Sequence, residues 1–91
     1  MQRDQIRNVL KTIFEDETGK PLDQLRDDTV MTEEFELDSV DMVGLIMQVE
    51  SHFRVRMTHG ELNEVSNVGS LLDLIEAKIS AMAAQPIRLA A

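Results

Sequence analysis

The fold of this chain is decided at Phe35-Glu36-Leu37-Asp38-Ser39-Val40-Asp41-Met42-Val43, where a long polar loop gives way to a helix. Asp38 is a residue type that caps helix N-termini, and apolar residues at helical spacing follow it. We therefore predict a helix over residues 39–53 with Ser39 at or near its first position. Its apolar stripe comprises Met42, Leu45, Ile46, Val49 and Phe53.

The same spacing predicts a helix on either side of this segment. Residues 4–16 place an apolar side chain every three or four positions, before Gly19 and Pro21 stop the helix. The last helix is expected from Asn67, a good N-cap, to about residue 80. Its apolar stripe comprises Val68, Leu71, Leu72, Ile75 and Ile79. A short third helix is expected over residues 60–65, so the predicted fold is an all-α, small four-helix bundle.

Residues 19–37 form a long loop between the first two predicted helices. Loops of this length are uncommon in compact domains and are usually functional. The loop and the following turn contain acidic residues and no Lys or Arg after Arg26. This acidic segment is either a solvated loop or a docking surface that ends at Ser39.

Three apolar residues of the segment 39–53 fall partly off its stripe. We expect Val40 and Met47 to be exposed, and Val43 to be covered by neighbouring helices. After Ser80 the apolar periodicity is lost, so residues 1–80 are expected to form the domain and residues 81–91 a flexible tail.

Composition excludes several classes of function. The chain has 91 residues, no cysteine and a net charge of -8. This length indicates a single domain. The negative charge argues against nucleic-acid binding, which needs basic patches, and favours basic protein partners. No secretory signal and no apolar run long enough to span a bilayer is visible, so we expect a soluble cytoplasmic protein. His52 and His59 lack metal-ligand spacing, and no nucleophile–base pair indicates an enzyme.

Ser39 is the residue with a distinct chemical use. The first turn of a helix offers unpaired backbone amides and positive potential, which suit a phosphodiester attached to that serine. Phosphoryl transfer to an alcohol also needs a metal, which a carboxylate such as Asp38 helps to recruit within a modifying enzyme. The alternative is that Asp38 and Ser39 only start a helix.

Residues 36–53 resemble the phosphopantetheine attachment region of acyl carrier proteins. That family has Asp-Ser-Leu-Asp, then Val-Glu-Leu, a Met and an acidic stretch ending in Phe. The matching residues are Asp38, Ser39, Asp41, Val43, Leu45, Met47, Glu50 and Phe53. The order of the predicted helices also agrees, so the resemblance covers about residues 2–80.

The resemblance implies that Ser39 receives 4′-phosphopantetheine from coenzyme A. The thiol of that arm would hold an acyl or aminoacyl group as a thioester, and the protein would be a substrate of other enzymes. Asp38 and Asp41 would assist a phosphopantetheinyl transferase, and Val40, Met47 and Glu50 would dock partners. The other implied partners are a loading ligase and a downstream acyltransferase or synthase. The protein itself is expected to be a monomer.

The sequence also departs from the family pattern. Val40 follows the serine in place of Leu, and Glu36-Leu37 stands where Gly and a small residue are usual. Gly44, Ser51 and His52 replace acidic residues of the docking helix. These departures favour a carrier dedicated to a specialised pathway, such as a secondary metabolite, a modified lipid or an amino acid. The alternative function is an unmodified acidic adaptor that binds other proteins.

Overall fold

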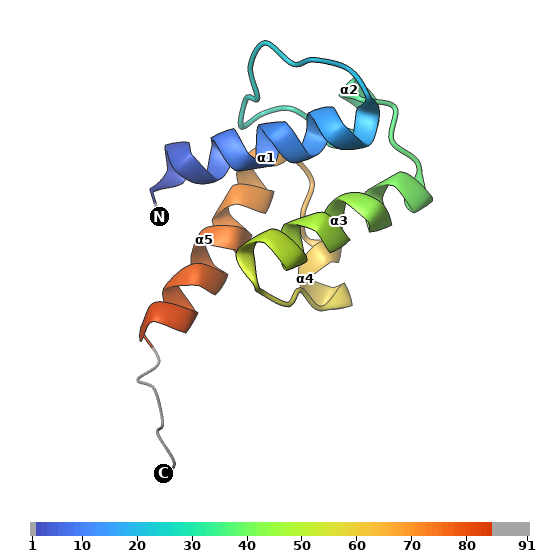
Figure 1. Cartoon of the computed structure of the whole chain (residues 1–91). Coiled ribbons are helices and arrows are strands. Elements are labelled where there is room, and N and C mark those ends of the chain that lie inside the picture. The colour runs from blue at the N-terminus through green and yellow to red at the C-terminus, as the bar shows by residue number, and fades with distance from the viewer. Residues whose placement is uncertain (1, 85–91) are drawn as a thin grey trace.

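The computed structural model describes residues 2–84, which contain five helices and no strand (Figure 1). The helices are α1 (Arg3–Thr18), α2 (Met31–Glu34), α3 (Ser39–Phe53), α4 (His59–Asn63) and α5 (Val68–Ala84). The all-α bundle predicted from apolar spacing is therefore confirmed, with one short helix more than expected.

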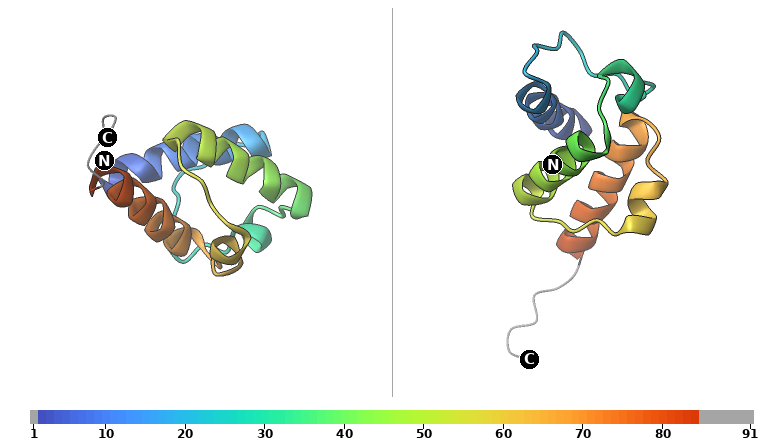
Figure 2. Two further views of the ribbon diagram at one scale, coloured as in Figure 1. Left: turned by 90° about the horizontal axis from the view of Figure 1, so that it is seen from below. Right: turned by 90° about the vertical axis from the view of Figure 1, so that its right-hand side faces the viewer.

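Helices α1, α3 and α5 enclose the core. Helix α3 runs back antiparallel to α1, so the end of α1 lies near the start of α3 (Figures 1 and 2). Helix α5 also packs on α1. Each helix buries most of the stripe expected from its sequence, because residues three and four apart share one face, and Met42 and Ile79 are only partly buried. The fully buried side chains are Ile6, Leu10, Phe14, Leu45, Val49, Val68, Leu71, Leu72 and Ile75.

Helix α1 ends where its sequence changes to glycine. Gly19 has a φ of 71°, a left-handed conformation that favours glycine, and its amide donates to the Glu15 carbonyl at 2.8 Å. The helix is longer than the predicted 4–16 by one residue at its start and two at its end.

The long loop closes over the start of α5. The amide of Val68 donates to the Thr29 carbonyl at 2.9 Å, and that of Gly69 donates to the Asp27 carbonyl at 2.8 Å. Arg3 and Arg7 of α1 form ion pairs with the Asp27 carboxylate. The loop therefore supplies backbone acceptors that the first turn of an isolated helix would lack.

Asn67 caps α5 as predicted, since its Oδ1 accepts a hydrogen bond from the Ser70 amide at 2.8 Å. The expected end of this helix near residue 80 is too early, because α5 continues through Ala84. Alanine and methionine are good helix formers, which accounts for a helix that outlasts its apolar periodicity. Residues 85–91 of the predicted tail lie outside the described residues.

Two short helices complete the bundle. The loop expected to be free of secondary structure contains α2, which buries Met31 against the core. Helix α4 begins with a capping box in which Thr58 and Glu61 each accept the other's amide. An ion pair of 2.7 Å between Glu61 and Lys78 joins α4 to α5.

Within residues 2–84, no helix is long and apolar enough to cross a bilayer.

Candidate functional site

The site is built around the first turn of α3. The amide of Asp41 donates to Asp38 Oδ1 at 2.8 Å, and the amide of Asp38 donates to Asp41 Oδ2 at 3.2 Å. This reciprocal arrangement is a capping box. The prediction that Asp38 caps the helix is confirmed, and Ser39 occupies the first helical position.

The Ser39 hydroxyl is open to solvent. Ser39 is exposed, and its side chain makes no hydrogen bond with any described residue. No acceptor in residues 2–84 is bonded to the amides of Ser39 and Val40. A phosphodiester on this oxygen would therefore meet free backbone donors at the positive end of the helix dipole. These features fit the attachment of a phosphate-linked group.

The approach to the serine is fixed by apolar side chains. Leu37 is buried, and the ring of Phe35 packs on Phe14 with centroids 5.2 Å apart. Glu36, between them, has a φ of 53°, in the left-handed region that favours glycine. The backbone at residue 36 therefore has a conformation suited to glycine, although a glutamate stands there.

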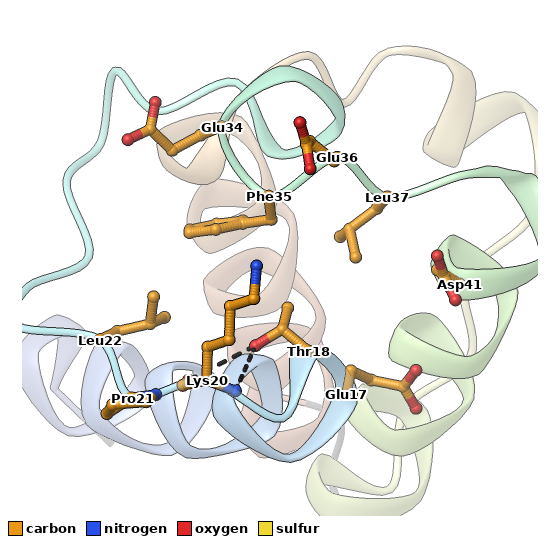
Figure 3. A pocket seen from close by; sticks show the side chains of 10 residues that line it. All are labelled: Glu17, Thr18, Lys20, Pro21, Leu22, Glu34, Phe35, Glu36, Leu37 and Asp41. Atoms are coloured by element: carbon orange, nitrogen blue, oxygen red, sulfur yellow. Dashed lines mark hydrogen bonds between the residues drawn. The ribbon is translucent and has the colours of Figure 1, made fainter.

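A hollow of about 470 Å³ lies beside the serine turn, between the end of α1, the loop and the start of α3 (Figure 3). Leu22, Phe35 and Leu37 supply its apolar wall, and the Lys20 side chain extends into it (Figure 3). Asp41 and Glu17 stand at the edge nearest α3.

Glu17 brings a carboxylate from α1 onto α3. Its Oε1 accepts a hydrogen bond from Gln48 Nε2 at 2.7 Å. A Cβ at Gly44 would lie only 3.0 Å from the same oxygen. The glycine therefore makes room for Glu17 at a position where the sequence comparison with the family expects an acidic residue on α3 itself.

The exposed face of α3 is apolar. The exposed fractions are 78% for Val40, 59% for Val43 and 63% for Met47. Exposure of Val40 and Met47 agrees with the prediction, but the expectation that Val43 would be covered is wrong. Positions 40, 43 and 47 share one helical face, and the neighbours of α3 pack against the opposite one.

Glu50, predicted as a docking residue, has a structural contact. It is half-buried, and its Oε2 accepts a hydrogen bond from the Met57 amide at 2.9 Å. That bond holds the segment after α3. The structure thus brings Asp38, Ser39, Val40 and Asp41 together at one turn, and sets Met47 and Glu50 further along the helix.

Sequence reasoning missed two members of this region, Glu17 and Val43. A glycine inside an amphipathic helix was the available signal for Glu17, because such a glycine often marks a close approach. For Val43, spacing alone does not tell which neighbour covers a helix face. In residues 2–84, no group of three or more His, Asp or Glu side chains is placed to bind a metal ion.

Comparisons with known proteins agree with this geometry. The family model described as "Phosphopantetheine attachment site" matches residues 8–75. The acyl carrier protein of Thermotoga maritima is 30% identical, over 85% of this chain and 95% of its own length. That of Chloroherpeton thalassium is 28% identical, over 86% of this chain and 98% of its own.

Solved structures show the same fold. The solution structure of holo acyl carrier protein from Geobacter metallireducens superposes with a TM-score of 0.80 at 25% identity, covering 91% of this chain and 95% of that one. The crystal structure of the Thermotoga maritima acyl carrier protein gives a TM-score of 0.79 at 24% identity, covering 90% and 95%. The chain therefore belongs to the acyl carrier protein family, whose members are not catalysts but carry acyl groups on 4′-phosphopantetheine for partner enzymes.

Proposed function

We propose that Ser39 is the attachment point and that the protein carries an acyl or aminoacyl thioester for a specialised pathway. One observation supports this above all others: the Ser39 hydroxyl is exposed at the first position of α3, beside amides that no described residue occupies. When attached, the arm supplies a thiol that holds the acyl group.

In the attachment reaction, Ser39 Oγ attacks the phosphorus that bears the pantetheine group of coenzyme A. A Ser–O–P bond forms, the pyrophosphate bond breaks, and adenosine 3′,5′-bisphosphate leaves. The hydroxyl proton passes to a base of the transferase, which also provides the magnesium site.

Asp38 and Asp41 have two roles in this proposal. One oxygen of each holds the capping box, which fixes the serine at the helix start. The second oxygen of each is left for the transferase and its metal. Loss of either side chain is therefore expected to affect both the position of the hydroxyl and its recognition.

The proposed partners are a phosphopantetheinyl transferase, a loading ligase and a downstream acyltransferase or synthase. The protein itself is proposed to be a cytoplasmic monomer. Dedication to one pathway is supported by the surface of α3. Ser51 and His52 stand where acidic residues are usual, which weakens attraction to uniformly basic partners at the C-terminal end of the helix, whereas Glu17 supplies a carboxylate beside Gly44. Val40 and Met47 are proposed to contact those partners, and Glu50 to help orient them.

The attachment is tested by incubating the protein with coenzyme A, magnesium and a phosphopantetheinyl transferase, followed by intact mass measurement. The proposal predicts a mass gain of one arm. Ser39→Ala abolishes the gain, whereas Ser51→Ala, at an exposed serine of the same helix, retains it. Absence of any gain with several transferases would favour the unmodified adaptor.

A further inference from the structure

We propose that α3 docks a partner protein whose surface is basic near Ser39 and acidic at the opposite end of the helix. The proposal rests on the carrier function above and specifies the partner of that same site. It starts from the exposed strip formed by Val40, Val43 and Met47, which runs from the first turn of α3 to beyond its middle. Such a strip gives a partner apolar contact, and the charges at its two ends decide which partner fits.

The end of this face next to Ser39 is acidic. Asp38 and Asp41 lie in the first turn, Glu36 is exposed just before it, and Glu17 reaches over from α1 to Gly44. The sequence contains no Lys or Arg from residue 27 to residue 53. A partner that brings a catalytic group to Ser39 therefore meets a negative potential here, and cations on its surface would be attracted.

The far end is basic. Arg54 and Arg56 are exposed and line a hollow of about 520 Å³ together with Met47. Arg54 follows the helix with a φ of 56°, so the chain turns there, and both arginines stand beside Met47 at the end of the apolar strip. Neither forms an ion pair within the described residues.

The nearby carboxylate offsets only part of this positive charge, because one glutamate stands beside two arginines. Glu50 also lines the hollow, but it is half-buried and accepts the Met57 amide. It forms no ion pair with either arginine, so the hollow keeps a net positive charge. From its N-terminus to its C-terminus, the exposed face of α3 is therefore first negatively charged, then apolar and then positively charged. A uniformly basic partner is repelled at the arginine end, and this repulsion provides specificity.

The test uses two helical peptides with the same leucine stripe. The bipolar peptide carries lysines in one half and glutamates in the other, and the uniform peptide carries lysines throughout. Each is titrated into the full-length protein, with and without the arm, and affinity is read from amide chemical shifts. The chain without substitutions is expected to bind the bipolar peptide about tenfold more tightly than the uniform peptide. A spin label on the lysine half should broaden amides near Ser39.

The Arg54→Glu/Arg56→Glu variant is expected to reverse the preference. The matched control, Lys11→Glu/Arg26→Glu, makes the same change of net charge at a hollow between α1 and the loop that no α3 residue lines, and it should retain the preference. Equal affinity of the chain without substitutions for both peptides would overturn the proposal. Amide chemical-shift changes that map away from α3 would overturn it as well. So would self-association of the chain through this face. Arm loading is measured separately by mass, so failure of the carrier function would be seen independently.

Discussion

Ser39 and Ser70 both lie in the first turn of a helix, yet only one is open to chemistry. The Ser70 hydroxyl accepts from the amides of Ser66 and Asn67 at 2.9 and 3.0 Å, and donates to the Asn67 carbonyl at 2.8 Å. The Ser39 hydroxyl is exposed and has no hydrogen-bond partner among the described residues. A serine at a helix start is therefore not sufficient for attachment; its oxygen must also be free.

The two helix starts differ in the same way. Loop carbonyls occupy the amides of Val68 and Gly69 at the beginning of α5. At the beginning of α3, the amides of Ser39 and Val40 have no acceptor in residues 2–84. The closed turn stabilises the fold, and the open turn is left for a ligand.

Replacing each of the two serines separately by alanine gives the largest expected effect on arm loading. Ser39→Ala should abolish arm loading and change the free energy of unfolding by less than about 0.5 kcal/mol, because it removes no internal contact. Ser70→Ala should retain loading and lose about 1–2 kcal/mol, because two amides lose their acceptor. Intact mass and urea unfolding measure both. Loading that survives in Ser39→Ala would break the comparison.

The apolar faces of α3 and α5 extend the comparison. Met47→Glu should lower partner-dependent transfer about tenfold and leave helical circular dichroism unchanged, since Met47 is exposed. Leu72→Ala, at a fully buried position of α5, should cost about 2–5 kcal/mol of stability instead. Equal loss of fold and transfer in Met47→Glu would place Met47 in the core.

The strained approach to α3 gives a smaller effect. Glu36→Gly should raise the free energy of unfolding by about 1 kcal/mol, because glycine adopts a φ near +53° without steric conflict. Glu33→Gly, inside helix α2, is the control and should lower stability. Thermal unfolding of both variants measures the difference. A loss of stability in Glu36→Gly would show that this residue is not strained.

The loop that closes α5 gives the smallest effect, and it depends on pH. The hydrogen bond from Arg7, and a second one from Arg3, lower the pKa of Asp27 below its usual value near 3.8. A carboxyl group with a lowered folded-state pKa stabilises the protein above its unfolded pKa, and this contribution disappears as pH falls through the folded value.

Asp27→Asn should therefore lower stability by about 0.5–1 kcal/mol at pH 7, a small value because the carboxylate is half-exposed and screened by solvent. The difference should vanish towards pH 2. Asp28→Asn, whose side chain forms only an exposed pair with Arg26, should show little change at either pH. A constant difference across this range would rule out the ionised carboxylate as its cause.

Much of the fold could be predicted because it depends on local sequence. The caps at Asp38 and Asn67, and the apolar stripes of the three long helices, follow from residue type and spacing. The exposed serine followed from the same reasoning, because a cap at residue 38 sets residue 39 at the helix start.

Other features depend on contacts between distant segments, which spacing does not contain. The exposure of Val43 depends on where α1 and α5 lie, and the position of Glu17 depends on a glycine 27 residues later in the chain. Helix α2 is only four residues long and was missed because it has no helical period to detect. The closed start of α5 arises from carbonyls of a loop about 40 residues earlier.

Fragmentation mass spectrometry of the protein after treatment with coenzyme A, magnesium and a phosphopantetheinyl transferase tests the central claim most directly. The open helix start predicts that a single arm is found on the fragment that contains Ser39, with Ser51, Ser66, Ser70 and Ser80 unmodified. An arm located on any of those serines, or a protein that accepts none, would contradict it.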